Sequence, residues 1–204
     1  MATRILLARH GETTWNREHR LQGRTDTELS ERGRAQARSL AALLAGERLD
    51  AIYTSTLRRT RDTAAPLAAR LQLEVQPRAE LDEISYGVLE GHTPDDPDPY
   101  FRDLWAQRRT DPLRFRAPEG ETYEELQARL EPFVREVLTR HADGHVLVVG
   151  HRATNRLLWG LFLGRSLAEC LAFKPKQDRI LELLPGARPD FRERFYPSHD
   201  VDAS

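Results

Sequence analysis

The stretch Ile5-Leu6-Leu7-Ala8-Arg9-His10-Gly11-Glu12-Thr13 decides how this chain is organised. Its first half is apolar and has the length of a buried strand, and its polar half follows without a break. In an open α/β sheet, ligands bind beyond the carboxyl ends of the strands. A histidine at that place, between an arginine and a glycine that lets the backbone approach a ligand, is a candidate reactive group. The alternative is a loop histidine that merely follows a core strand.

Two further apolar runs end in polar residues in the same way. Residues 51–54 are followed by the polar segment 55–60, and residues 145–149 by Gly150-His151-Arg152. The run 145–149 is continuously apolar, as expected for a central strand buried on both faces. In a parallel sheet the three strand ends lie at one edge, so histidines, arginines and helix N-termini can converge there. Such a site suits phosphate, which arginine forks and free backbone N–H groups bind well.

The remaining pattern alternates between strand and helical spacing. It predicts helices over residues 30–45, 57–71, 122–141 and 152–162, and strands over 73–75, 178–184 and 191–195. Ser30 and the pattern Thr122-x-x-Glu125 mark two of the helix starts. Strands that alternate with helices give an α/β fold. We therefore expect a three-layer α/β/α sandwich with a mostly parallel sheet, in a single domain spanning residues 1–204.

Residues 92–120 differ in character from the rest of the chain, because they are rich in proline and aspartate. Phe101, Leu104 and Trp105 recur at helical spacing and predict a short helix near 98–109. We interpret this segment as a small insertion that caps the site, with an apolar face that serves packing.

Composition restricts the compatible classes of function. A net charge of −1 over 204 residues gives no field that would recruit nucleic acid or a membrane surface, so neither is expected as a partner. No run reaches the roughly 18 apolar residues that span a bilayer, and the first apolar run is too short for a signal-peptide core. Cys170 is the only cysteine, which excludes a disulfide framework. We therefore expect a cytoplasmic protein. The sequence specifies no oligomeric state and leaves a homodimer open.

The polar segments together resemble a known family. They are Arg9-His10-Gly11-Glu12-Thr13 with Asn16, Leu21-Gln22-Gly23, the stretch 29–37, Thr54-Ser55-x-Leu57-Arg58-Arg59-Thr60-x-x-Thr63-Ala64, Leu81-x-Glu83-x-x-Tyr86-Gly87 and Gly120-Glu121-Thr122. In this order, from about residue 4 to residue 163, they resemble the histidine phosphatase (phosphoglycerate mutase-like) superfamily, in its phosphatase branch. One Arg-His-Gly triplet would be weak evidence, whereas six ordered blocks are specific.

The resemblance implies a role for each matching position. His10 would be the nucleophile that becomes phosphohistidine, and Glu83 would protonate the leaving group and then act as the base for water. The remaining positions would hold the phosphoryl group or border the substrate mouth: Arg9, Asn16, Gln22, Gly23, Arg58 and His151. Among these, His151 would act as a cation. The family pattern needs no metal and no cofactor.

Two features of the match leave alternatives open: which residue is the acid, and what Arg152 does beside the second histidine. Asp82 and Glu90 are further acids near the expected pocket edge, although the family's glutamate aligns with Glu83. His151 is followed by Arg152, where the family commonly has glycine. Whether Arg152 reaches the substrate stays open at this point.

Two further groups of residues have a functional and a structural interpretation. Arg108 and Arg109 in the insertion could clamp a second anionic group of the substrate, or form a solvated pair. A metal site made of His10, His92 and His151 is possible on paper, but the arginines beside two of these histidines would repel a cation.

The leading hypothesis for function is a phosphomonoesterase that hydrolyses a small phosphorylated metabolite through phosphohistidine. A cofactor-dependent phosphoglycerate mutase-type phosphotransferase is the first alternative. The family's mutases carry a longer insertion between the acid and the second histidine, so the short segment here favours hydrolysis. A catalytically dead module that binds a phosphorylated ligand is the other alternative, and the presence of both histidines speaks against it. No motif in residues 92–120 identifies the physiological substrate.

Overall fold

The strands pair into one mixed sheet. The computed structural model describes residues 3–175 and 179–195. Within them the sheet has the order β3-β2-β4-β1-β5-β6. The strands are β1 (Arg4–Arg9), β2 (Ala51–Thr54), β3 (Val75–Pro77), β4 (His145–Gly150), β5 (Arg179–Leu184) and β6 (Asp190–Phe195). The first four run parallel to one another, and β5 and β6 pair antiparallel with their neighbours. The predicted mostly parallel sheet is confirmed, although β3 begins at Val75 rather than at residue 73.

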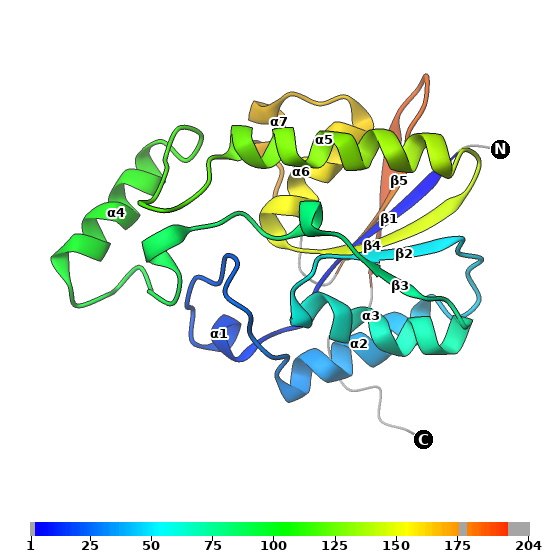
Figure 1. The fold of residues 1–204 in the computed structure, drawn as a ribbon, viewed down its shortest axis with the longest axis horizontal. Helices are drawn as coiled ribbons and strands as arrows, with labels where there is room; N and C mark the ends of the chain where they lie inside the picture. The colour runs from blue at the N-terminus through cyan, green and yellow to red at the C-terminus, as the bar shows by residue number, and fades with distance from the viewer. Residues whose placement is uncertain (1–2, 176–178, 196–204) are drawn as a thin grey trace.

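Helices cover both faces of this sheet (Figure 1). One layer holds α2 (Glu31–Leu43) and α3 (Arg58–Leu71), and the other holds α5 (Tyr123–Arg140) and α6 (Arg152–Leu163). Side chains of a strand alternate between the faces. Thus β1 sends Leu6 and Ala8 into the core under α2 and α3, and Ile5 and Leu7 into the core under α5 and α6. The predicted three-layer α/β/α sandwich is confirmed.

The capping signals read from the sequence operate as expected. The hydroxyl of Ser30 accepts a hydrogen bond from the backbone N–H of Gly33 at 3.0 Å and begins α2. Thr122 and Glu125 cap each other's backbone at the start of α5. Two short helices were not predicted, α1 (Thr14–Arg17) and α7 (Leu167–Ala172). Each has fewer than two turns, so neither shows a helical period in the sequence.

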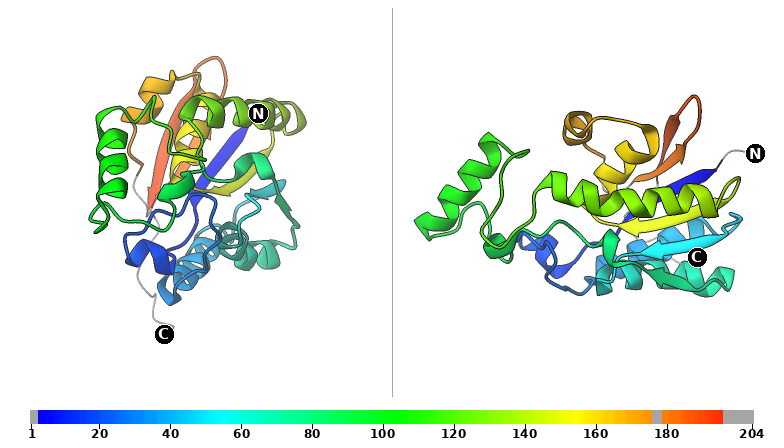
Figure 2. Two further views of the ribbon diagram at one scale, coloured as in Figure 1. Left: turned by 60° about the vertical axis from the view of Figure 1, so that its left-hand side comes forward. Right: turned by 45° about the horizontal axis from the view of Figure 1, so that its top comes forward.

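The insertion has a small core of its own. Its helix α4 (Pro99–Thr110) stands apart from the three layers, beyond the end of the sheet that also carries α1 (Figure 2). Leu104 and Trp105 are buried there against Leu89 and Ala117, and Phe101 packs on the same cluster. The apolar face of α4 therefore serves packing, as predicted.

The strand order brings the polar strand ends together. β4 lies between β1 and β2 and runs parallel to both, so the carboxyl ends of these three strands meet at one edge of the sheet. His10, Ser55 and His151 follow these strands directly. In the described part of the chain, no helix is both long enough and apolar enough to cross a membrane.

Candidate active site

Two buried histidines form the centre of the site. His10 is 3% exposed and His151 is fully buried, and their ring centroids lie 5.2 Å apart. The backbone N–H of His10 donates to the carbonyl of Gly150 at 3.0 Å, which continues the pairing of β1 with β4 by one residue. The two histidines are therefore placed by the sheet itself.

A backbone hydrogen bond sets the tautomer of His10. Its Nδ1 lies 2.7 Å from the carbonyl oxygen of Gly11, and only a protonated nitrogen can donate to that acceptor. The proton therefore resides on Nδ1, and Nε2 keeps its lone pair. Burial, followed by the charges of Arg9 and Arg59, holds the pKa of His10 well below its usual value. His10 is thus a neutral imidazole with a free nucleophilic nitrogen.

His151 is fixed from the other side. Its Nε2 lies 2.8 Å from Oγ of Ser55, while its buried Nδ1 has no hydrogen-bond partner among the described residues. Burial lowers the pKa of His151 well below its usual value, and Arg59, His10 and Arg9 lower it further. Burial and neighbouring cations both favour the neutral ring, in contrast to the cationic His151 that was expected.

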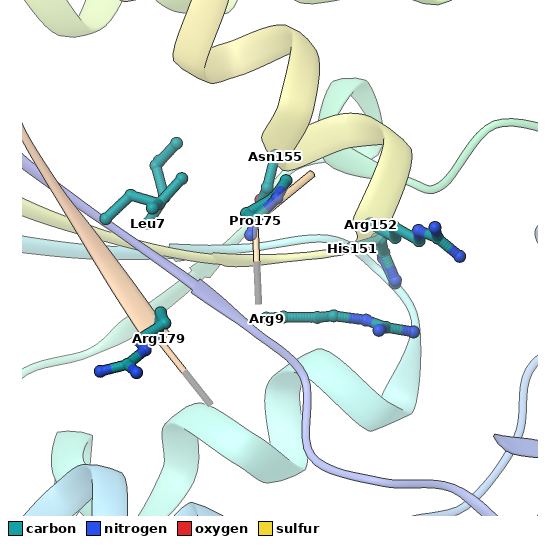
Figure 3. Close-up of a pocket in the computed structure, with 8 residues that line it drawn as sticks. Leu7, Arg9, His151, Arg152, Asn155, Pro175 and Arg179 are labelled. Atoms are coloured by element: carbon teal, nitrogen blue, oxygen red, sulfur yellow. The ribbon is translucent and has the colours of Figure 1, made fainter. Parts of the chain in front are cut away.

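Two arginines surround the histidines. Arg9 extends from the end of β1 toward His151 (Figure 3), and its charge acts on the pKa of both rings. Arg59 lies in α3, is fully buried and acts on both rings as well. The site therefore concentrates positive charge around two neutral imidazoles, as a phosphoryl group requires.

The structure does not bring Arg58 to the histidines. Its guanidinium is 53% exposed and pairs with Glu28 and Asp62 on the surface of α3. Positions 58 and 62 share the solvent face of the helix, whereas Arg59 shares its buried face with Thr63 and Leu67. The structure therefore places Arg59, and not the predicted Arg58, on the buried side of α3, and the phase of the apolar residues in this helix is the signal that separates them.

Arg59 is anchored by the loop that follows α1. Its two terminal nitrogens donate to the carbonyls of Thr25 and Gly23 at 2.8 and 2.7 Å, while its Nε has no partner among the described residues. Gly23 has a left-handed backbone (φ +54°), and a Cβ there would lie 2.0 Å from a carboxylate oxygen of Glu90. Gln22 is buried and accepts a hydrogen bond from Thr27. Gln22 and Gly23 therefore shape the loop that anchors Arg59.

Asn16 has both a structural contact and spare donors. Its Oδ1 accepts from the backbone N–H and the hydroxyl of Thr13 at 3.1 and 3.2 Å, which caps α1. No other described residue accepts from its Nδ2 group. The amide hydrogens thus stay available to a ligand.

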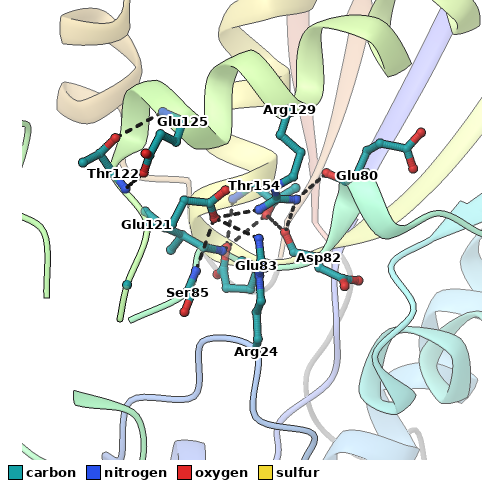
Figure 4. A network of polar contacts seen from close by, with 12 residues as sticks. Arg24, Glu80, Asp82, Glu83, Ser85, Glu121, Thr122, Glu125, Arg129 and Thr154 are labelled. Atoms are coloured by element: carbon teal, nitrogen blue, oxygen red, sulfur yellow. Dashed lines mark hydrogen bonds and ion pairs between the residues drawn. The ribbon is translucent and has the colours of Figure 1, made fainter. Parts of the chain in front are cut away.

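The N-terminus of α6 holds Glu83 rather than a free anion. The carboxylate accepts hydrogen bonds from the backbone N–H groups of Ala153 and Thr154 at 3.1 Å and from the hydroxyl of Thr154 at 3.0 Å (Figure 4). Asp26 similarly accepts from the backbone N–H of Arg58, at the start of α3. The expectation that these helix ends would bind phosphate is therefore wrong, because the chain's own carboxylates occupy them. Through this contact Glu83 binds the first turn of the helix that follows His151. The charge of Glu83 also acts on the pKa of Arg59.

The other two candidate acids are engaged elsewhere. Asp82 accepts from the backbone N–H and the hydroxyl of Thr56 at 2.8 Å. Glu90 accepts from the backbone N–H groups of Arg24, Thr25 and Tyr86 and from the hydroxyl of Thr25. Both carboxylates bind neighbouring loops, whereas Glu83 binds the N-terminus of α6, the helix that His151 precedes.

A basic pocket opens beside His151. It is small, with a cavity volume of about 20 Å³, and is lined by Leu7, Arg9, His151, Arg152, Asn155, Pro175, Arg179 and Leu181 (Figure 3). Arg152, which stands where the family commonly has glycine, therefore contributes a cation to the wall of a pocket that it shares with Arg9 and His151.

Arg108, Arg109 and His92 lie in the insertion of residues 92–120. Arg108 stacks over the rings of Tyr86 and Trp105 and donates to the Tyr86 hydroxyl at 3.3 Å, so it is not a solvated side chain. Arg109 is exposed. His92 stacks on Phe101 and has its Nδ1 2.7 Å from a carboxylate oxygen of Asp96, so the structure does not bring it to His10 and His151.

Comparisons with known proteins identify the family of this chain. The family model described as "Histidine phosphatase superfamily (branch 1)" matches residues 5–186. Phosphoserine phosphatase 1 of Hydrogenobacter thermophilus is 34% identical over 170 residues, which cover 83% of this chain and 81% of that protein. A 6-phosphofructo-2-kinase/fructose-2,6-bisphosphatase of Arabidopsis thaliana is 36% identical over 94% of this chain, which spans only 25% of that longer protein.

A solved structure from Escherichia coli, described as an alpha-ribazole-5'-P phosphatase, superimposes with a TM-score of 0.85 at 26% identity and covers 100% of both chains. The resemblance seen in the sequence is thereby confirmed. This chain belongs to branch 1 of the histidine phosphatase superfamily.

Proposed function

We propose that this histidine phosphatase is a phosphomonoesterase that works through a phosphohistidine on His10. The observation that carries the proposal is the bare Nε2 of a neutral, buried His10 that lies between Arg9, Arg59 and His151. A neutral imidazole is a nucleophile, and the surrounding cations stabilise the charge on the transferred phosphoryl oxygens. In this assignment Arg59, rather than Arg58, is the second arginine of the phosphate clamp.

The first half-reaction moves the phosphoryl group to His10. The lone pair of Nε2 attacks phosphorus while the bond from phosphorus to the leaving oxygen breaks. Glu83 in its protonated form gives its proton to that oxygen, so the leaving group departs as an alcohol. Nδ1 of His151 and the Nδ2 group of Asn16 donate to phosphoryl oxygens, because neither has a partner among the described residues.

The second half-reaction returns the site to its starting state. Glu83, now ionised, takes a proton from water, and the hydroxide attacks phosphorus. The bond between Nε2 and phosphorus breaks, inorganic phosphate leaves, and Glu83 again carries the proton. This sequence needs no metal and no redox cofactor.

The substrate belongs to the small phosphorylated metabolites. The relatives described above are named for phosphoserine, for fructose 2,6-bisphosphate and for ribazole 5'-phosphate, which share a phosphate ester of a small alcohol and little else. We therefore propose a panel of such esters, ranked by kcat/KM, as the way to name the alcohol. Efficient interconversion of 3-phosphoglycerate and 2-phosphoglycerate with catalytic 2,3-bisphosphoglycerate would instead support the phosphotransferase alternative.

The decisive experiment combines rapid quenching with one substitution. Wild-type protein that has turned over a phosphate-labelled substrate is expected to carry acid-labile, base-stable label on His10. His10→Ala is expected to carry no label and to release no phosphate from p-nitrophenyl phosphate. Label on a serine, or equal inactivity of the two proteins, would overturn the proposal and favour the binding-module alternative.

A further inference from the structure

An ion pair outside the phosphate site connects α5 to the segment that carries Glu83. Arg129 of α5 and Glu121 form two parallel hydrogen bonds of 2.9 Å, from Nε to Oε1 and from Nη2 to Oε2 (Figure 4). Both side chains are largely buried, at 19% and 12% exposure. A bidentate pair of this kind fixes direction as well as distance.

The third nitrogen of Arg129 binds the backbone that precedes Glu83. Its Nη1 donates to the carbonyls of Glu80 and Asp82 at 2.7 and 3.1 Å, with a longer contact to Ala79. Apart from one short 3-10 turn, Ala79–Leu81, this segment lies in no helix or strand. Its carbonyls therefore depend on donors from other segments, which Arg129 supplies together with the hydroxyl of Thr154 on the Asp82 carbonyl.

Glu121 binds the backbone on the other side of Glu83. Its Oε2 accepts from the backbone N–H of Ser85 and from Nη2 of Arg24, each at 3.3 Å. Nε of Arg24 in turn donates to the carbonyl of Glu83 at 3.4 Å. The pair thus holds the chain immediately before and immediately after the acid, while the carboxylate itself rests on α6.

We propose that Arg129 and Glu121 are positioning residues for proton transfer by Glu83. The inference rests on the proposed function, in which Glu83 protonates the leaving group. Neither side chain contacts the histidines, and of the causes that lower the pKa of His151 the charge of Arg129 is the smallest. Their effect on the reaction therefore passes through the backbone of Glu83, whose placement has to be correct to within a fraction of an ångström.

The chemistry of the leaving group separates this role from a general effect on stability. A nitrophenolate leaves without a proton at neutral pH, whereas an alkoxide has to be protonated as it departs. Loss of a correctly placed acid thus slows phosphoryl transfer from an alkyl phosphate more than from p-nitrophenyl phosphate. A damaged phosphate clamp or a partly unfolded protein slows both alike. Because kcat/KM reports the first transfer, it is the quantity to compare.

The test measures kcat/KM for p-nitrophenyl phosphate and for O-phospho-L-serine, or whichever alkyl phosphate the panel ranks highest. Arg129→Gln and Glu121→Gln are expected to lower the value for the alkyl phosphate about tenfold or more, a part of the 100-fold or larger contribution of an acid. The value for p-nitrophenyl phosphate is expected to change about threefold or less. Glu83→Gln provides the reference for full loss of the acid, and Arg129→Lys, which keeps the charge but not the fork, is expected to fall between.

Arg135→Gln is the matched control. Arg135 lies on the same helix, is 69% exposed and pairs with Glu131 across 3.6 Å, so its removal is expected to leave both values unchanged. If Arg129→Gln lowers both values equally while Glu83→Gln is selective, the positioning role is wrong and the proposed function stands. If Glu83→Gln itself is not selective, Glu83 is not the acid and the positioning role fails, while the phosphohistidine on His10 is unaffected. If the wild type hydrolyses neither ester, the proposed function fails and the positioning role fails with it.

Discussion

Nε2 of His151 lies 2.8 Å from Oγ of Ser55, and both residues are fully buried. Thr60 lies on the far side of the serine, with its hydroxyl 2.8 Å from the same Oγ, and donates to the carbonyl of Leu57. Because the hydroxyl proton of Thr60 is donated to Leu57, Thr60 does not donate to Ser55. The hydroxyl proton of Ser55 can then point either to Thr60 or to Nε2 of His151. A serine that donates to Nε2 keeps the histidine proton on Nδ1, the nitrogen without a partner among the described residues.

Ser55→Ala is therefore expected to lower kcat/KM for p-nitrophenyl phosphate about tenfold, the cost of one lost hydrogen bond of about 1.4 kcal/mol. The reason is that His151 loses the partner that keeps a proton on Nδ1. Heteronuclear NMR of the imidazole nitrogens gives the tautomer directly, and steady-state kinetics gives the rate. An Ser55→Ala protein with full activity and Nδ1 still protonated would show that the serine does not set the tautomer.

Arg59 and Arg58 offer a comparison between adjacent residues. Arg59→Gln is expected to lower kcat/KM about 100-fold or more, because it removes a buried cation whose charge acts on both histidines. Arg58→Gln is expected to change it about twofold or less, because this arginine is 53% exposed and exposed ion pairs contribute little. Arg59→Lys, which retains the charge, is the conservative control variant. Circular dichroism checks that each variant is folded. A larger effect of Arg58→Gln would restore the assignment made from the sequence.

The histidines make stability depend on pH. Burial holds the pKa of His10 and of His151 well below 6.5 in the folded chain, so the unfolded state binds more protons as the pH falls through 6.5. The contribution of the neutral histidines to the free energy of unfolding is fully present above pH 6.5. It is lost as the pH falls from 6.5 toward the lower pKa of the folded state. Each histidine is expected to lower the free energy of unfolding by up to about 1 kcal/mol between pH 6.5 and 5.5.

Urea unfolding at several pH values measures this dependence. His10→Gln, whose side chain does not titrate, is expected to show a shallower loss of stability over the same interval. Identical pH dependence in the two proteins would mean that His10 titrates in the folded chain as it does in the unfolded one.

Gly23 connects a backbone conformation to the position of Arg59. Gly23→Ala is expected to destabilise the protein by about 1–2 kcal/mol for the left-handed backbone alone. A further cost arises because the new Cβ would lie 2.0 Å from a carboxylate oxygen of Glu90. Since the carbonyl of Gly23 anchors Arg59, kcat/KM is expected to fall as well.

Gly46→Ala is the control for Gly23→Ala, because a Cβ at position 46 meets nothing within 4 Å. Thermal unfolding and the p-nitrophenyl phosphate assay are expected to leave this control within error of the wild type. Equal effects of the two substitutions would show that the left-handed backbone and the close approach of Glu90 at Gly23 do not determine the loss.

The sequence predicted whatever local pattern determines. Apolar runs placed the strands before His10, Ser55 and His151, and the parallel sheet then brought those strand ends together. The choice between Arg58 and Arg59 depends on which face of α3 is buried. The spacing of Thr63 and Leu67 indicates that face, and Arg59 lies on it. The charge state of His151 depends on burial, a tertiary property that no local pattern specifies.

The network around Glu83 could not be predicted from the sequence either. Arg129 is one of the many arginines of this chain, and in the sequence it looks like a surface residue of an amphipathic helix. Only the folded backbone shows that it donates to carbonyls some fifty positions away. The occupation of the α6 N-terminus by Glu83 has the same origin, because it joins segments that are distant along the chain.

The pairing of β1 with β4 has a consequence for biosynthesis. Arg9 pairs with Gly150, so β1 completes this ladder only with a strand that is synthesised much later. During translation His10 leaves the ribosome long before His151 exists, and no fragment that stops short of β4 can hold the two rings together. Long-range contacts of this kind form slowly. Phosphatase activity is thus a late product of folding, and a nascent chain carries a latent His10 until the central strand arrives.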